Sequence, residues 1–338
     1  MMKCNPTGLG PVHVFMNLFH LMGHGSAIQP AWCCTHGRQC MPVASDVDVT
    51  GSPCQDFAPN GHRLGVHGPQ WPVFEAWAAV MLSQNVPVIV HENVPQFDVD
   101  ALAMIMQHKY LIFTVIVDCA ALGFRLISRR RRFTIMYHRT KTRLVCSPVW
   151  LHAQLVQAMA VDMCRTAFRI CDCFLADAAE IANEIVEVCL AKGIALDTAM
   201  QDMTLLLTPG EYERLRLYLE AWVARVGLPA HHCWWAVFNL ADNPGAGYTT
   251  WSAASGRIPG LRTHNAKLWV PYLGRWLTNR ELLACMGVPV YRHLAAAAQV
   301  SQVHVRPGSD SRHMLGNMMH IAAVGSVMAV AMASCVVL

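Results

Sequence analysis

The spacing of apolar and polar residues predicts two strands and a helix between them in the stretch 46–91. Residues 46–50 (DVDVT) alternate polar and apolar side chains and then meet a Gly-Ser-Pro turn, which is typical of a strand that ends in a turn. Residues 86–91 (VPVIVH) predict a second strand, and residues 73–82 predict an amphipathic helix. A strand, a helix and a strand in such a short stretch form a βαβ unit, which implies that the two strands are parallel.

Two short segments follow these strands, at residues 53–55 and 92–94. The carboxyl ends of parallel strands meet at one edge of a sheet, and ligands bind beyond that edge. We therefore expect the two segments to face one cleft. A Gly-rich polar stretch, residues 56–68, lies between the first strand and the helix and predicts a loop next to the same cleft.

The middle of the chain has a helical pattern of a different character, from residue 150 to residue 228. Thr208 and Glu211 have the spacing of a capping box at the start of a helix, and Gly227 is typical of its end. Residues 229–265 are rich in turn residues. This pattern predicts a separate, largely helical insertion.

The last eighteen residues, Ile321 to Leu338, contain no charge. This length is at the lower limit for crossing a bilayer. The residues are mostly Ala, Val, Ser, Gly and Met, and neither a cationic cluster nor an aromatic belt flanks them. The pattern favours a buried core helix over a membrane anchor, so we expect no membrane partner.

Charge is concentrated in one stretch of a chain that is otherwise poor in charged residues. The 338 residues are 54% hydrophobic and 14% charged, which argues against a disordered chain, and the net charge is only +4. Between residues 125 and 143, however, eight Arg or Lys residues occur without an acidic residue. Such a cluster forms either a solvated surface or an edge that binds nucleic-acid phosphates. The run 133–137 (FTIMY) predicts a strand that would hold the cations at the end of a sheet.

The fourteen cysteines suggest reduced thiols rather than a disulfide framework. Such frameworks are typical of short secreted chains with a signal peptide, and the first thirty residues lack that pattern. We expect an intracellular protein, located in the nucleus if the organism is eukaryotic. Two groups of cysteine and histidine residues invite comparison with zinc sites: Cys33, Cys34, His36 and Cys40, and His231, His232 and Cys233. Neither group has paired CxxC spacing, so we predict no metal ion.

The runs TGSPCQDFAPNGHRLGVHGP and HENV are the first two of five motifs that follow one another along the chain. Together the five resemble the catalytic core of the DNA (cytosine-5) methyltransferases, which contains a Pro-Cys-Gln loop and a Glu-Asn-Val segment. Residues 127–131 (ISRRR) are similar to the family's Gln-x-Arg-x-Arg element. Residues 275–281 (RWLTNRE) are similar to its Arg-x-Leu-Thr-x-Arg-Glu segment, and residues 315–320 (LGNMMH) to its Gly-Asn segment.

The resemblance implies an α/β fold, the Rossmann-like fold of S-adenosylmethionine-dependent methyltransferases, with a largely helical insertion. The methyltransferase domain would comprise residues 1–139 and 266–338, and residues 140–265 would take the place of the target-recognition region. The implied activity is methyl transfer from S-adenosylmethionine to carbon 5 of cytosine in duplex DNA. The implied catalytic residues are Cys54, Glu92, Arg129 and Arg131, and the implied cofactor-binding residues are Pro53, Asn93, Gly316 and Asn317.

The chemistry of cytosine explains these residue types. Carbon 5 is a poor nucleophile, and it can attack a methyl group only after a nucleophile has added to carbon 6. A thiolate such as that of Cys54 is suited to this addition, and its place in a turn favours ionisation. Glu92 would hold nitrogen 3 and the exocyclic amine, and Arg129 and Arg131 would support the base and the sugar-phosphate. The target base must leave the helix stack, so residues 56–68 would close over a flipped nucleotide.

Three positions depart from the family pattern. The only candidate for the glycine turn of the cofactor site is at Gly23 and Gly25, and Gly23 lies 31 residues before Cys54 (54 − 23). A single βαβ unit takes about 30 residues, so two strands with their helices hardly fit there. Position 127 is Ile where the family has Gln, and position 58 is Ala where it often has Ser. Two alternatives stay open: a catalytically inactive relative that binds DNA through its arginines, and an RNA cytosine-5 methyltransferase.

Overall fold

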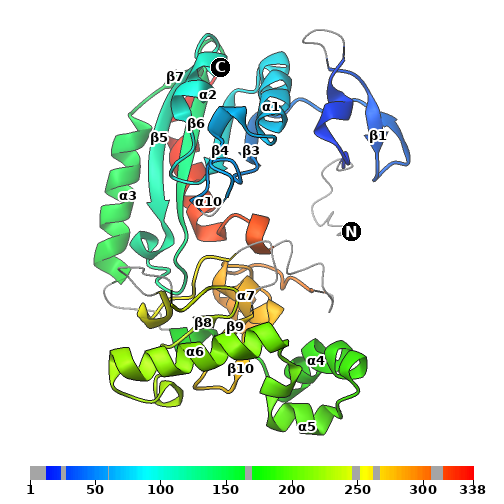
Figure 1. Cartoon of the computed structure of the whole chain (residues 1–338). Helices are drawn as coiled ribbons and strands as arrows, with labels where there is room; N and C mark the ends of the chain where they lie inside the picture. Colours follow the sequence, from blue (N-terminus) through cyan, green and yellow to red (C-terminus); the bar gives the residue numbers. More distant parts are fainter. Residues whose placement is uncertain are drawn as a thin grey trace. The chain divides into compact units, whose positions relative to one another are not determined.

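A computed structural model describes most of the chain, which forms two compact units (Figure 1). Unit 1 comprises residues 1–117, 130–155 and 326–338, and unit 2 comprises residues 118–129 and 156–325. The described residues are 13–23, 28–59, 61–163, 170–245, 252–261, 267–305 and 315–338. The predicted boundaries at residues 139 and 265 stay a prediction.

A mixed sheet with the strand order β3-β4-β6-β5 forms the centre of unit 1. Strands β3 (Val47–Gly51) and β4 (Val88–Asn93) are parallel, and helix α1 (Trp71–Gln84) lies between them in the chain. Strand β6 (Arg130–His138) pairs antiparallel with β4, and β5 (Tyr110–Asp118) is its other neighbour. The predicted βαβ unit is confirmed. The strand predicted at 133–137 begins three residues earlier and therefore includes the arginines from 130 to 132.

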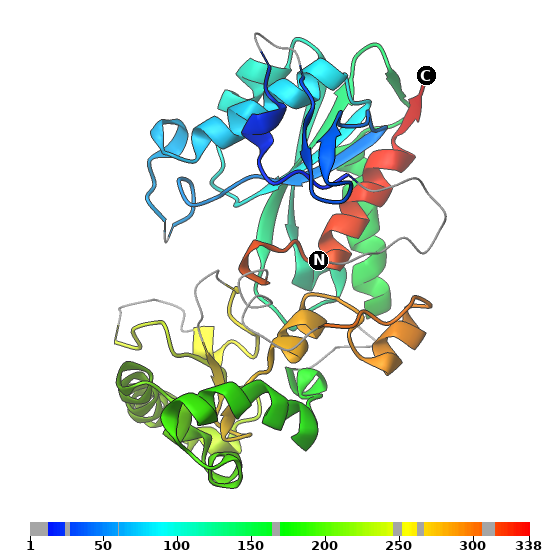
Figure 2. The same ribbon diagram turned by 90° about the vertical axis from the view of Figure 1, so that its right-hand side faces the viewer.

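Helices cover both faces of this sheet (Figure 2). Met136 of β6 belongs to the same buried cluster as Phe74 and Trp77 of α1. The hydroxyl of the next residue, Tyr137, instead lies 3.2 Å from the carbonyl oxygen of Ala331, in helix α10 (Ile321–Ala333). Because successive residues of a strand point to opposite faces, α1 and α10 lie on opposite sides of the sheet. This is the α/β architecture that the sequence predicts.

The remaining strands of unit 1 form two separate two-stranded sheets. Strand β7 (Thr142–Leu144) pairs antiparallel with β11 (Cys335–Val337), and β1 (Ala31–Cys33) pairs antiparallel with β2 (Arg38–Cys40). Helix α2 (Val99–Met106) follows β4, and helix α3 (Pro148–Met163) follows β7. Two short 3-10 helices are η1 (Leu18–Leu21) and η2 (Gly65–His67).

The apolar C-terminal stretch forms α10, which buries Val327, Val330 and Ala331 and leaves Met332 43% exposed. Within the described residues, Leu315–Ala333 is the one segment long and apolar enough to cross a membrane by length and composition, with a mean hydropathy of 1.5. About a third of it (33%) is buried in the protein. Its packing agrees with the predicted core helix on one face, and the expectation that no membrane is bound stays a prediction.

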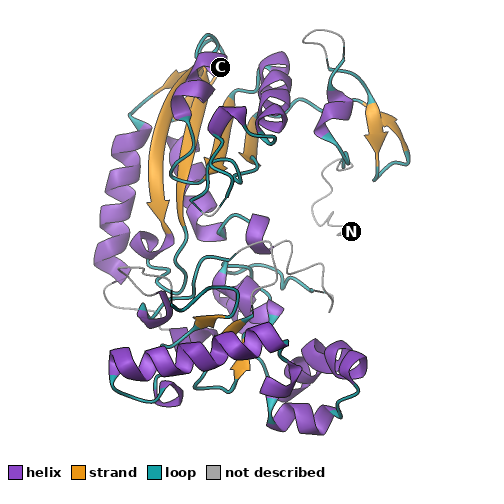
Figure 3. Ribbon diagram, in the orientation of Figure 1, coloured by secondary structure: helices purple, strands orange, loops and turns teal. Residues whose placement is uncertain are grey.

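Unit 2 is built mostly from helices around a small sheet with the order β10-β9-β8 (Figure 3). The strands are β8 (Phe238–Asn239), β9 (Leu268–Val270) and β10 (Arg275–Trp276). The helices are α4 (Ala178–Lys192), α5 (Leu196–Gln201), α6 (Pro209–Val226), α7 (Asn279–Cys285) and α8 (Arg292–Ala297). The short 3-10 helices are η3 (Cys119–Leu122), η4 (Ile170–Cys173), η5 (Met203–Leu206), η6 (Ala230–His232) and η7 (Ser252–Ala254).

Helix α6 organises the core of unit 2. Thr208 and Glu211 form the predicted capping box at its start, and Gly227 ends it with a φ of 75°. Tyr218 and Trp222 of this helix pack against Phe238, with ring centroids 4.8 and 5.7 Å from that of Phe238. The predicted helical character of the middle of the chain is therefore confirmed.

Candidate active site

The carboxyl ends of β3 and β4 meet at one edge of the unit 1 sheet. Gly51, the last residue of β3, is the register partner of Glu92 in β4. Pro53 and Cys54 therefore leave the sheet beside Glu92, as the sequence predicts for parallel strands. The segments that carry the cysteine and the carboxylate therefore lie at the same edge of the sheet.

Hydrogen bonds connect the two chain segments at this edge. The side-chain amide of Asn93 donates to the hydroxyl of Ser52 at 2.9 Å and to its carbonyl oxygen at 3.3 Å. The Oγ of Ser52 is 2.8 Å from Nε2 of His91. Burial lowers the pKa of His91 to about 3, so its ring is neutral near pH 7. These bonds fix the start of the segment that carries Cys54, and sequence reasoning missed the roles of Ser52 and His91.

Cys54 begins a turn and its side chain is half-buried. The carbonyl oxygen of Cys54 accepts hydrogen bonds from the amides of Phe57 and Ala58, at 3.0 and 2.8 Å. The chain after the cysteine is therefore folded back on itself, so that the cysteine lies at the point where the chain leaves the sheet.

The loop that follows is anchored rather than open. Asp56 is fully buried, and its Oδ2 accepts a hydrogen bond from the amide of Gln70 at 2.8 Å. Gly68 is required beside it, because a Cβ at this position would lie 2.0 Å from the Asp56 carboxyl carbon. The acidic side chain of Asp56 thus holds the end of the loop against α1, and the closure of residues 56–68 over a flipped nucleotide stays a prediction.

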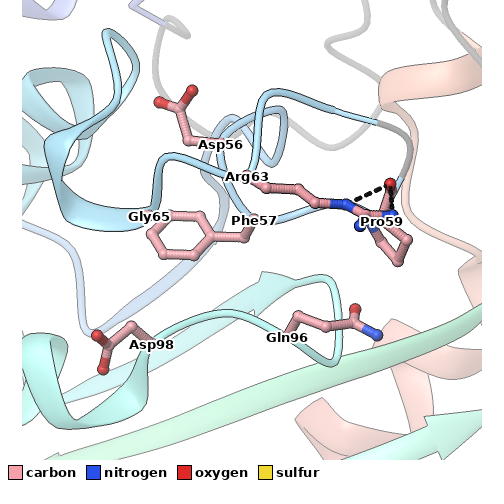
Figure 4. Close-up of a pocket in the computed structure, with 7 residues that line it drawn as sticks. All are labelled: Asp56, Phe57, Pro59, Arg63, Gly65, Gln96 and Asp98. Carbon is pink, nitrogen blue, oxygen red and sulfur yellow. Dashed lines mark hydrogen bonds between the residues drawn. The ribbon is translucent and has the colours of Figure 1, made fainter.

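An open cavity of about 630 Å³ lies beside this loop (Figure 4). It is lined by Asp56, Phe57, Pro59, Arg63 and Gly65 from the loop, and by Gln96 and Asp98 from the turn after β4. A cavity of this volume accommodates a small organic ligand. Its lining offers an aromatic ring, a guanidinium group and an amide. The first lining residue after Cys54 in the chain is Asp56, two residues later, and the first after Glu92 is Gln96, four residues later.

Glu92 forms an ion pair with Arg131, whose Nε lies 2.9 Å from its Oε1. The register explains this pairing. Glu92 is opposite Phe133 in β6, and Arg131 is two residues before Phe133, so it is a diagonal neighbour on the same face of the sheet. The carboxylate and the guanidinium that the sequence assigns to one site are therefore in contact.

The other arginines of the cluster have different roles. Arg132 donates to the carbonyl oxygen of Pro95, from Nε at 2.9 Å and from Nη2 at 2.6 Å, and so holds the turn after β4. Arg130 is exposed. Arg129 belongs to unit 2, where it is 3% exposed and donates to the carbonyl oxygens of Gly316, at 3.4 Å, and Met318.

The predicted cofactor-binding residues fall into two groups. Pro53 and Asn93 lie at the sheet edge of unit 1, and Gly316 and Asn317 lie in unit 2 near Arg129. The Asn93 side chain is 1% exposed; its amide donates to Ser52, and its oxygen accepts from the amide of Val94 at 2.8 Å. These bonds occupy the polar groups of Asn93 inside the protein.

The described residues before β3 do not fit the family's nucleotide cradle. They form η1 and the β1-β2 hairpin, whereas the cradle requires a strand, a glycine turn and a helix. Gly25 of the candidate glycine turn lies outside the described residues. Within the described part of the chain, the residues before β3 therefore do not form the adenosine site that the resemblance implies.

The motif RWLTNRE forms an internal network in unit 2. Arg275 makes a bidentate ion pair with Glu281, with both contacts at 2.8 Å, and the Glu281 side chain is completely buried. Glu281 and Thr278 form the capping box of α7, and the hydroxyl of Thr278 donates to Glu180 at 2.7 Å. These contacts give the motif a structural role in this unit.

Comparisons with known proteins return distant likenesses in structure. No protein-family model matches the chain, and no curated protein matches it. Similar solved structures include the Dnmt2 methyltransferase of S. pombe, with 12% identity, 85% of this chain and 77% of that chain covered, and a TM-score of 0.43. A putative DNA modification methyltransferase of an E. coli prophage has 13% identity, 86% and 80% coverage, and a TM-score of 0.44. The methyltransferase EhMeth of Entamoeba histolytica has 13% identity, 85% and 77% coverage, and a TM-score of 0.42. At these values the likenesses do not bear on function.

Proposed function

We propose that the chain is a methyltransferase that acts on carbon 5 of cytosine in DNA, with Cys54 as the nucleophile. The main support is the shared edge of β3 and β4. The register pairs Gly51 with Glu92, so Cys54 and the carboxylate follow two adjacent parallel strands. The ion pair between Glu92 and Arg131 brings an arginine that the resemblance assigns to the site into contact with the carboxylate.

The protein's own residues account for activation of the base. The thiolate of Cys54 forms a bond to carbon 6, and the electrons of the carbon 5–carbon 6 double bond move into the ring, which makes carbon 5 nucleophilic. Glu92 binds the exocyclic amine and shares a proton with nitrogen 3, so that negative charge in the ring is stabilised. Arg131 fixes the orientation of Glu92. A base reaches these groups only after it has left the helix stack.

S-adenosylmethionine is the methyl donor that the resemblance implies, and it would supply an electrophilic methyl group. The described residues before β3 do not form its adenosine site. The same observation favours the second candidate function, a catalytically inactive relative that binds DNA.

Exchange of the hydrogen at carbon 5 tests the nucleophile without a methyl donor. Addition of the thiolate makes carbon 5 accept a solvent proton, and elimination then releases the original hydrogen. Wild-type protein should release tritium from DNA that contains [5-³H]cytosine, and Cys54→Ser should not. Cys146→Ser removes another half-buried thiol of unit 1 and is the matched control. If the wild type releases no tritium with or without S-adenosylmethionine, the chain is not this enzyme and the inactive relative is favoured.

A trapped adduct tests the complete reaction. In 5-fluorocytosine DNA the fluorine cannot leave as a cation after methyl transfer, so the cysteine stays bound to carbon 6. The wild type should form an adduct that survives denaturation only when S-adenosylmethionine is present. An absent adduct together with tritium exchange would mean that the chain activates cytosine but does not transfer a methyl group.

The choice between DNA and RNA is tested by competition. We expect duplex DNA to displace a labelled cytosine oligonucleotide more effectively than structured RNA of the same length does. Arg130 is the exposed arginine at the start of β6. Arg130→Glu should weaken binding and lower the salt slope by about one. Stronger competition by RNA would favour an RNA cytosine-5 methyltransferase.

A further inference from the structure

Four metal-ligating side chains gather at the β1-β2 hairpin of unit 1. They are His13, Cys33, His36 and Cys40, and one ligand atom from each lies within 4.8 Å of the others. Cys33 ends β1 and Cys40 ends β2, and His36 lies in the turn between the strands. Among the described residues this is the one such group of three or more.

We propose that this cluster is a structural zinc site with two thiolate and two imidazole ligands. The residues within the hairpin have the spacing C-x₂-H-x₃-C. Two cysteines with two histidines are a common ligand set for structural Zn²⁺, and two thiolates neutralise the charge of the ion. Four protein ligands leave no open position for catalysis.

Distances among the ligand atoms are close to those of a tetrahedral site. The Nδ1 of His36 lies 3.4 Å from Sγ of Cys33 and 3.6 Å from Sγ of Cys40. Ligand atoms around tetrahedral zinc are separated by roughly 3.3–3.8 Å, as follows from the usual zinc–ligand bond lengths. The largest separation, 4.8 Å, therefore needs to close by only about 1 Å.

The backbone explains how three of the ligands come together. Cys33 and Arg38 are register partners in the hairpin, and Ala31 is the partner of Cys40. Gly37 has a φ of 62°, and its amide donates to the carbonyl oxygen of Cys33 at 2.8 Å, so the chain turns tightly between the strands. This turn directs His36 toward both sulfur atoms.

The fourth ligand comes from a segment twenty residues before Cys33. Phe15 forms an antiparallel bridge with Cys33, and the amide of Cys34 donates to the carbonyl oxygen of Val14 at 2.7 Å. These contacts bring His13 beside His36, with ring centroids 4.6 Å apart. The Nδ1 of His13 is buried and has no hydrogen-bond partner within the described residues. This is expected of a metal-ligand atom in the absence of its metal ion.

The sequence predicts no metal here because residues 33–40 contain no CxxC pair. Of the four cysteine and histidine residues in this stretch, Cys34 is not a member of the cluster, and the three that remain are fewer than a closed zinc site needs. His13 supplies the fourth, and its contribution depends on the bridge at Phe15, which the local pattern does not reveal. The site would attach the N-terminal segment to the hairpin.

Metal content of the full chain gives the direct test. Protein purified under reducing conditions with zinc present should contain about one zinc per chain, and Cys33→Ser and Cys40→Ser should each reduce this to less than about 0.2. Cys34→Ser is the matched control, because Cys34 is the neighbouring thiol and is not a member of the cluster. Absence of zinc in the wild type, or equal loss in the Cys34 variant, would overturn the proposal.

Cobalt spectroscopy separates loss of the site from misfolding. Co²⁺ bound to the wild type should show the intense visible bands of tetrahedral coordination together with thiolate charge-transfer absorption. His13→Ala should lose these bands, whereas His13→Cys should keep them and increase the charge-transfer absorption, because cysteine can replace histidine as a ligand. If His13→Ala leaves the bands unchanged, or if alkylation and mass spectrometry show a Cys33–Cys40 disulfide in freshly lysed cells, the proposal fails.

Discussion

Each unit contains an ion pair between a glutamate and an arginine, and the two pairs differ in their surroundings. In unit 2, Arg275 binds both oxygens of Glu281, and the side chains are 8% and 0% exposed. In unit 1, Arg131 makes one contact of 2.9 Å with Glu92, and the side chains are 21% and 11% exposed. The same two residue types therefore form a closed pair in one unit and a partly accessible pair in the other.

The difference bears on the proposal that Glu92 takes part in catalysis. The oxygens of Glu281 also accept hydrogen bonds from the amides of Thr278 and Ala176, at 2.8 and 3.1 Å. Its acceptor capacity is thus used inside unit 2. Glu92 lies at the carboxyl edge of a sheet, where ligands bind in α/β folds. The side chain of Glu92 is 11% exposed at this edge, whereas that of Glu281 is completely enclosed.

Removal of Arg275 should have the largest effect on stability. Arg275→Ala leaves the buried carboxylate of Glu281 without its charge partner, so we expect a loss of about 3–5 kcal/mol in the free energy of unfolding. Urea denaturation of the full chain measures this loss. Arg216→Ala is the control, because Arg216 pairs with Glu213 and Glu220 on the exposed surface of α6 and should change the denaturation midpoint little. Equal midpoints for the two variants would contradict the contrast between buried and exposed pairs.

Local sequence patterns were sufficient to predict strands and helices and one edge of the candidate site. The alternation in residues 46–50 and the capping box at Thr208 each depend on neighbours a few residues apart, and both appear in the structure as predicted. The arrival of the segments that carry Cys54 and Glu92 at one sheet edge follows from the parallel arrangement of two strands, which the short βαβ connection already implies.

Contacts that depend on distant register could not be predicted. Arg131 meets Glu92 because β6 pairs antiparallel with β4, and nothing in the sequence near either residue gives that register. Arg129 is two residues before Arg131 in the chain but belongs to unit 2, where it binds carbonyl oxygens of residues 316 and 318 of the same unit. The motif RWLTNRE could be matched to a family from its letters, whereas its role as a buried network depends on Glu180, about one hundred residues earlier.

Acid should destabilise unit 2 through His320. Burial and the nearby charge of Arg129 lower the pKa of His320 from its ordinary value of 6.5 to about 4. The folded state therefore keeps the ring neutral while the unfolded state binds a proton, so stability is lost as the pH falls from 6.5 toward 4, by about 3 kcal/mol. Denaturation midpoints between pH 7 and 4 measure this slope.

The control for the acid experiment is another histidine of the same unit. His320→Asn should reduce the slope of the free energy of unfolding against pH, by an amount that corresponds to up to about one bound proton. His231→Asn changes an exposed residue of η6 and should leave this slope unchanged. A slope that survives in His320→Asn would mean that other groups cause the acid sensitivity of unit 2.

The capping boxes allow a smaller comparison within unit 2. Thr208 and Thr278 each accept a hydrogen bond from a glutamate amide three residues later, at 3.3 and 3.1 Å. Thr278 also donates to Glu180 and lies within the buried network. We expect a loss of about 1–2 kcal/mol for Thr278→Ala and about 0.5–1 kcal/mol for Thr208→Ala in the free energy of unfolding. A larger loss for Thr208→Ala would show that the network around Glu281 contributes less than its burial indicates.

The smallest effect on stability should come from the pair in unit 1. Glu92→Gln keeps the shape of the side chain and removes its charge, and Arg131 is accessible enough for water to replace the ion pair, so we expect a loss of less than about 1 kcal/mol in the free energy of unfolding. The same substitution should abolish tritium release from carbon 5 of cytosine, because the amide cannot stabilise the charge that develops at nitrogen 3. The urea midpoint and tritium release, measured on the same variant, distinguish a structural role of Glu92 from a catalytic one. A variant that unfolds much more easily than the wild type, yet still exchanges tritium when folded, would place Glu92 with Glu281 as a structural residue.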